Sequence, residues 1–176
     1  MGVEMQSTGE AACFGNSFYD ALSKGLTSVG YNLPKTGSAL VTIGGVENRE
    51  KLLRTSALLK SLGFKILATE TTAEFFAEKL GDVTVVHKIS EPERKPNISD
   101  LLHEKKIDFI INIPSTSTIE KYVGMLYDEY QIRRKSLELG IPVLSTIELA
   151  ESFVKTLEWL QKNETSKNSL QPYRDG

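Results

Sequence analysis

The sequence predicts an α/β domain built on a doubly wound, five-stranded parallel sheet with helices on both faces. Short apolar runs rich in β-branched residues alternate with longer amphipathic runs along most of the chain. Glycine follows several of the amphipathic runs, as expected where helices end. Strands that are apolar throughout, and not at alternate positions, are typical of a sheet buried on both faces.

The predicted strands are the short apolar runs, at residues 39–43, 65–68, 83–86, 108–113 and 142–144. A helix is expected between the first two strands, at residues 47–62, where Leu52, Leu59 and Leu62 recur at helical spacing before Gly63. The same reasoning predicts helices at residues 71–80, 98–105, 127–139 and 147–161.

The first 37 residues do not follow this alternation. They predict an extended stretch, a helix at residues 17–26 and a linker that ends at Gly37. We therefore divide the chain into an N-terminal helical appendage with its linker (1–37), an α/β domain (38–162) and a flexible polar tail (163–176).

Composition excludes several classes of function. The 21 basic and 23 acidic residues are spread along the chain, so no basic arm predicts nucleic-acid binding. A single cysteine, Cys13, cannot form an intramolecular disulfide. No apolar run reaches the ~20 residues of a membrane helix, and the start lacks a signal-peptide pattern. We expect a cytoplasmic or organelle-matrix protein whose partner is a small molecule or another protein.

Polar residues follow four of the five predicted strands, at the sheet edge where α/β domains bind ligands. After the first strand a Gly-Gly turn leads to Arg49, near a helix N-terminus; the alternative is a plain turn with a solvated arginine. After the second strand, Thr69 and Thr72 can offer hydroxyls to an anion; the alternative is that Thr69 or Thr71 merely caps the helix. After the third, Lys88 can add a positive charge.

After the fourth strand, Asn112 and Ser115 offer an amide and a hydroxyl that can hydrogen-bond the neutral part of a ligand. The alternative is a strand end followed by a helix cap. His87 and His103 have no histidine or cysteine at ligand spacing, so we expect no metal site, and nothing indicates a cofactor. Together these residues predict a rim that binds a small anion.

The chain resembles the methylglyoxal synthase-like family over about residues 38–160. The resemblance rests on Phe64-Lys-Ile-Leu-Ala-Thr-Glu-Thr-Thr-Ala, His87-Lys, Asp108-Phe-Ile-Ile-Asn-Ile-Pro and Gln131-Ile-Arg-Arg-Lys-Ser. Within that family it is similar to the C-terminal regulatory domain of carbamoyl-phosphate synthase large subunits. The run from Gly2 to Gly15 is similar to the tail of the preceding ATP-grasp half of that enzyme.

The resemblance implies that Arg49, Thr69, Thr72 and Lys88 hold the anionic part of an effector, with Asn112 and Ser115 on the rest. It also implies that this chain is not a catalyst by itself. The catalytic groups of methylglyoxal synthase would fall on Lys95, Ser115 and Tyr127, none of which is a carboxylate or histidine. The parent ligase uses ATP and Mg²⁺, and its other ATP-grasp domains, or a second copy, would be the protein partners.

The effector stays open between two classes. The Thr69-Glu70 pair and the Tyr173-Arg174 tail resemble urea-type synthases, which use N-acetyl-L-glutamate and work in the mitochondrial matrix. Lys88 instead favours a phosphate, as in the bacterial enzymes that bind UMP or IMP. The pathway would be pyrimidine, arginine or urea synthesis. Two further hypotheses are an assembly module that has lost ligand binding and, less favoured, a phosphosugar lyase.

Overall fold

The computed structural model describes residues 11–114 and 119–167, with side chains from 11–114 and 127–163. Its centre is a five-stranded sheet made of β1 (Gly37–Ile43), β2 (Phe64–Thr69), β3 (Thr84–Val86), β4 (Phe109–Ile113) and β5 (Val143–Leu144). The strands are all parallel and lie in the order β3-β2-β1-β4-β5. This confirms the predicted fold class and the predicted number of strands.

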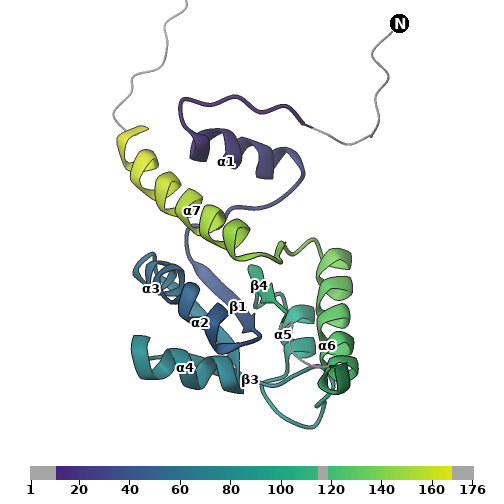
Figure 1. Cartoon of the computed structure of the whole chain (residues 1–176). Coiled ribbons are helices and arrows are strands. Elements are labelled where there is room, and N and C mark those ends of the chain that lie inside the picture. Colours follow the sequence, from purple (N-terminus) through teal and green to yellow (C-terminus); the bar gives the residue numbers. More distant parts are fainter. Residues whose placement is uncertain (1–10, 115–118, 168–176) are drawn as a thin grey trace, which may run out of the picture.

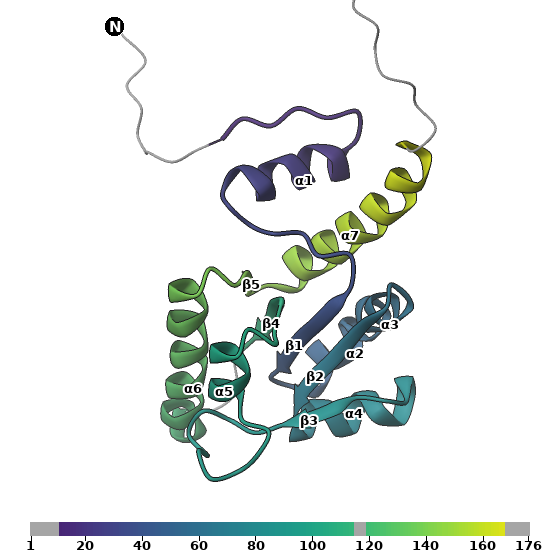
Figure 2. The same cartoon turned by 180° about the vertical axis from the view of Figure 1, so that it is seen from behind.

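Helices cover both faces of the sheet (Figures 1 and 2). One face carries α3 (Leu53–Ser61), α4 (Glu70–Leu80) and α7 (Ile147–Lys167), with α2 (Val46–Lys51) leading into α3; the other carries α5 (Ile98–His103) and α6 (Ile119–Glu138). Alternate strand residues belong to two separate hydrophobic clusters, so that Val41 packs under α3, α4 and α7 while Leu40 packs under α5. A sheet covered on both faces explains why its strands contain consecutive apolar residues and not apolar residues at alternate positions only.

The larger cluster is organised around Phe109, which is fully buried in β4. Its ring centroid lies 5.5 Å from that of Phe64 in β2 and 4.9 Å from that of Phe153 in α7. The aromatic contacts thus join the sheet to the last helix.

Three predicted helix limits were wrong. The single helix expected at 47–62 is two helices, because the backbone turns at Leu52 (φ −86°, ψ 1°) to bury that side chain completely. The helix expected to begin at Tyr127 begins at Ile119. The last helix extends to Lys167, six residues beyond the expected end at Gln161, although its sequence there is polar.

The described part of the N-terminal segment, residues 11–36, lies along α7 and not on the sheet (Figure 1). Its helix α1 (Phe18–Ser28) is capped by Ser17, whose hydroxyl accepts a hydrogen bond from the Asp20 N–H at 3.2 Å. Leu26 reaches the larger hydrophobic cluster, and Gln161 of α7 donates to the Lys35 carbonyl at 2.5 Å. The division of the chain at residue 37 stays a prediction. Within the described ranges no helix is both long and apolar enough to cross a membrane.

Candidate functional site

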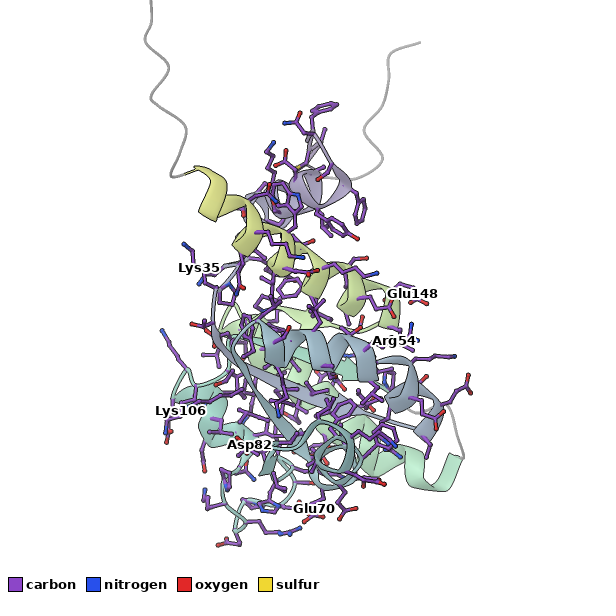
Figure 3. The ribbon with its side chains drawn as sticks, turned by 90° about the vertical axis from the view of Figure 1, so that its left-hand side faces the viewer. Lys35, Arg54, Glu70, Asp82, Lys106 and Glu148 are labelled. Atoms are coloured by element: carbon purple, nitrogen blue, oxygen red, sulfur yellow. The ribbon has the colours of Figure 1, made fainter. Side chains whose placement is uncertain are left out.

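The predicted rim residues lie at the carboxyl edge of the sheet. β1 and β4 are paired so that Thr42 stands beside Asn112 and Ile43 beside Ile113, while Thr69 ends β2 beside Val86 of β3. Every strand that carries a predicted site residue therefore ends at this edge. The loops that follow form its surface, at the end of the domain opposite α1, where Glu70 is labelled in Figure 3.

Arg49 is buried, with a relative exposure of 8%, so it is not the solvated arginine of the alternative interpretation. Its Nη1 donates to the Ile43 carbonyl at the end of β1, at 3.2 Å, and its guanidinium lies 5.8 Å from the Phe75 ring centroid. Its Nε is buried and has no hydrogen-bond partner in the structure. A buried, charged N–H without a partner is costly, and an anion at this position would satisfy it.

Thr72 is held against the same carbonyl as Arg49. Its hydroxyl accepts from the Ile43 N–H at 3.2 Å and donates to the Ile43 carbonyl at 3.3 Å. A threonine hydroxyl has one proton to donate, so Thr72 must turn from Ile43 before it can donate to a ligand. In this structure Thr72 therefore fastens α4 to β1.

The N-terminus of α4 is not capped by a side chain. Thr69 occupies the cap position with extended backbone angles, and its hydroxyl makes no capping hydrogen bond. The structure therefore does not support the alternative interpretation, in which Thr69 merely caps the helix. An uncapped first turn leaves N–H groups and the positive end of the helix dipole facing the rim.

Asn112 is as buried as Thr72, each with a relative exposure of 1%. Its Oδ1 accepts a hydrogen bond from the Thr42 hydroxyl at 3.0 Å, whereas its Nδ2 is buried without a partner. The free N–H groups can only donate, so the matching ligand group must be an acceptor such as a carbonyl or acidic oxygen.

The loop between β3 and α5 brings Lys88 to the rim with an exposed side chain. Asn97 organises this loop from within, because its Nδ2 donates to the Lys88 carbonyl at 2.6 Å and to the Glu91 carbonyl at 2.9 Å. Ser90 fastens the loop to α6 through its N–H and hydroxyl, which donate to the Asp128 carboxylate at 2.9 and 2.8 Å.

Sequence reasoning missed three groups at this loop. Arg94 forms an ion pair with Glu70, the first residue of α4, and His87 Nδ1 lies 3.7 Å from the same carboxylate. The hydrogen bond and charge of Arg94 lower the pKa of Glu70, with smaller contributions from His87 and Lys88. The pairing of Arg94 with Glu70 cannot be read from the sequence, because a long loop separates Arg94 from β3. The position of Glu70 beside the predicted site residue Thr69 could have indicated that Glu70 lies at the rim.

The structure thus brings Arg49 and Thr72 together at Ile43, and it places the charge of Lys88 where it helps to lower the pKa of Glu70. Asn112 lies on the other side of the edge, because it faces α5 and α6 together with Thr42. Ser115 falls outside the described residues. Among those that are described, no group of three or more histidine, cysteine or carboxylate side chains is placed to hold a metal ion.

A separate hollow of about 250 Å³ is lined by residues other than those of the predicted rim. It is open to solvent, and it is formed by α6, β5 and the segment before β1; the lining residues are Tyr31, Arg133, Leu137, Ile141, Val143 and Ser145. None of the predicted site residues contributes to it.

Comparison with known proteins places the chain among relatives of carbamoyl-phosphate synthase. It is 32% identical to the multifunctional protein pyr1-3 of Dictyostelium discoideum over 161 residues, which is 92% of this chain and 7% of that protein. It is 33% identical over 176 residues to the carbamoyl phosphate synthase large chain of Methanobrevibacter smithii, or 100% of this chain and 16% of that one. The chain thus spans only a small part of these relatives.

One solved structure with a related shape is methylglyoxal synthase from Elizabethkingia anophelis, with a TM-score of 0.48, 15% identity and coverage of 69% of this chain and 79% of that one. Residues 51–145 match the family model described as the MGS-like domain, and this match runs from the end of α2 to the end of β5. The chain belongs to the family of MGS-like domains.

Proposed function

We propose that this chain is the allosteric, effector-binding part of a carbamoyl-phosphate synthase, and that the rim binds a small anionic metabolite. The relatives that match nearly all of this chain are carbamoyl-phosphate synthases or multifunctional proteins, which supports the first part. The observation that carries the second part is the pair of buried donors without partners, Arg49 Nε and Asn112 Nδ2, at the carboxyl edge of the sheet.

The effector in this proposal presents an acidic group and a separate acceptor oxygen. The acidic group would lie between Arg49, Thr69, Thr72 and Lys88, in front of the uncapped first turn of α4, where the charge and the helix dipole favour an anion. The acceptor would meet Asn112, and Ser115, which falls outside the described residues, stays a predicted ligand from the sequence. N-acetyl-L-glutamate, UMP and IMP all carry both kinds of group.

Regulation would follow from the way in which the rim is joined to the rest of the domain. The loop that carries Lys88 is hydrogen-bonded to α6 through Ser90 and Asp128. An anion that draws Lys88 inward would therefore pull on α6, and a neighbouring synthase domain that contacts α6 would sense it. Coupling between such sites is typically ~1–3 kcal/mol and acts equally in both directions.

Calorimetric titration of the purified chain with UMP, IMP and N-acetyl-L-glutamate tests this proposal. We expect one of them to bind with a stoichiometry of one, and Asn112→Asp to weaken it at least tenfold, because the only free N–H donors of that side chain become a carboxylate. Arg133→Met, in the separate hollow, is the matched control and leaves the affinity unchanged. Absence of binding by all three to folded protein refutes an effector role.

A role in assembly is a second candidate, favoured by one observation. α6 exposes Tyr127 (54%), Tyr130 (58%) and Leu137 (82%), side chains that are common in protein interfaces. The partner would be an ATP-grasp domain of the synthase or a second copy of the chain. Sedimentation of the isolated chain distinguishes the two: a dimer that Tyr130→Ser converts to a monomer indicates self-association.

The synthase role carries the further proposals of ATP and Mg²⁺ use by the parent enzyme, a place in pyrimidine, arginine or urea synthesis, and a cytoplasmic or mitochondrial-matrix location. Catalysis by the chain alone is tested by incubation with dihydroxyacetone phosphate, from which we expect no release of phosphate.

A further inference from the structure

Arg94 lies beside the N-terminus of α4, at the rim, and forms an ion pair with a carboxylate of the protein itself. Its guanidinium forms an ion pair with Glu70 and a longer hydrogen bond, of 3.4 Å, with Glu91. Glu70 is the first residue of α4, directly after Thr69, which stands at the cap position but makes no capping hydrogen bond. A carboxylate of the chain therefore lies beside the helix end where the proposed effector anion would bind.

The pair is built so that it can open. The Glu70 and Arg94 side chains are both about half-exposed, at 51% and 47%, so water can replace either partner at little cost. His87 Nδ1 is 3.7 Å from Glu70 and makes no hydrogen bond, so it does not fix that carboxylate. Among the described contacts of Glu70, only the ion pair with Arg94 is at hydrogen-bond distance.

The loop that delivers Arg94, by contrast, is well anchored. Asn97 is 1% exposed and hydrogen-bonded to two carbonyls of the loop, and Ser90 is bonded twice to the buried Asp128. The loop can therefore hold Arg94 at the mouth whether or not Glu70 is its partner. A fixed cation with a replaceable counter-ion suits an exchange of anions.

We propose that Arg94 is a further anion-binding residue of the rim and that Glu70 is its resident competitor, displaced when the effector binds. This inference rests on the proposed function, since it assigns residues to the same site. It predicts that Glu70 lowers the affinity for an anion only as long as Arg94 is present, because the competition takes place at Arg94. A carboxylate that acted by simple repulsion would lower the affinity in either background.

A double-mutant cycle on the full 176-residue chain tests the exchange, with whichever of UMP, IMP and N-acetyl-L-glutamate binds most tightly as the ligand and inorganic phosphate as a competing probe. We expect Glu70→Gln to tighten binding about two- to fivefold, which is the size of an exposed ion pair. We expect Arg94→Gln to weaken binding and to abolish the effect of Glu70→Gln. Arg94→Lys keeps the charge and recovers part of the affinity.

The outcomes separate the two levels of the proposal. Equal tightening by Glu70→Gln with and without Arg94 overturns the exchange and shows repulsion instead. An affinity that falls in Arg49→Met but is unchanged in both Arg94→Gln and Glu70→Gln overturns the exchange alone. Absence of binding in the wild type and in every variant overturns the proposed function and the exchange with it. Urea unfolding of each variant verifies that it is folded, as expected for two half-exposed side chains.

Discussion

Replacing Arg49 by methionine separates a binding role from a structural role. The substitution removes the hydrogen bond from Nη1 to the Ile43 carbonyl and the contact with the Phe75 ring. The hydrogen bond contributes about 1.5–3 kcal/mol and the ring contact about 0.5–2 kcal/mol to the stability of the fold. The Ile43 carbonyl keeps its hydrogen bond from Thr72 at 3.3 Å, so it is not left without a donor.

The substitution also removes a cost. A buried guanidinium whose Nε has no partner carries a desolvation penalty of about 1–3 kcal/mol, which methionine does not. Because the losses and the gain are of similar size, we expect the free energy of unfolding of Arg49→Met to stay within about 2 kcal/mol of the wild type. The affinity for the effector, by contrast, loses a charge-assisted hydrogen bond and falls about 10- to 150-fold.

Urea unfolding and calorimetric titration on the same preparations measure the two quantities. Arg54→Met is the matched control, because Arg54 is an exposed arginine of the neighbouring helix α3 (Figure 3) and should change neither. The reasoning is refuted if Arg49→Met destabilises the domain by more than about 3 kcal/mol and leaves the affinity as it was. In that case Arg49 would be a structural residue and its free Nε a tolerated defect.

Three other substitutions test separate parts of the structure by chemical unfolding. Asn97→Ala removes three hydrogen bonds and should cost about 2–4 kcal/mol; a cost below about 1 kcal/mol would mean that the loop is held elsewhere. Phe109→Ala empties the centre of the larger cluster and should lower the free energy of unfolding by about 3–5 kcal/mol. A variant that unfolds at the same urea concentration as the wild type would contradict this. Burial raises the pKa of Glu129 in the folded state above its ordinary value of 4.5. The protonated side chain therefore stabilises the fold at low pH, and this contribution is lost as the pH rises from the ordinary pKa through the raised pKa. Glu129→Gln should therefore stabilise the domain at pH 7 and have no such benefit at pH 4; an equal benefit at both would contradict the pKa argument.

The sheet was predictable because its strands are buried on both faces. Runs such as Ala39 to Val41 and Phe109 to Ile111 are apolar at every position, and the glycines after the helices separate one unit from the next. Helix limits were less predictable, since tertiary packing decided them. The turn at Leu52 buries one side chain in the larger cluster, and helical periodicity cannot reveal such a turn because the leucines on both sides keep their spacing.

The location of the candidate site was predictable from the sequence, but the contacts within it were not. Parallel strands end at one edge, so residues placed after them meet there, as Arg49 and Thr72 do at Ile43. The sequence does not show on which side of the edge a residue points, and this separates Asn112 from Arg49. The sequence also does not show which hydroxyl is already used, so the bonds between Thr72 and β1 came only from the structure.

The contact between Phe153 and Phe109 has a consequence for the order in which the chain folds during synthesis. α7 also supplies Val154 and Leu157 to the larger cluster, and it carries the contacts to α1, which precedes the sheet. The part of this face that α3 and α4 do not cover therefore stays exposed on the ribosome until α7 has left the exit tunnel. During that interval the nascent chain exposes a flat apolar surface, so this segment should need a holding chaperone more than its small size suggests.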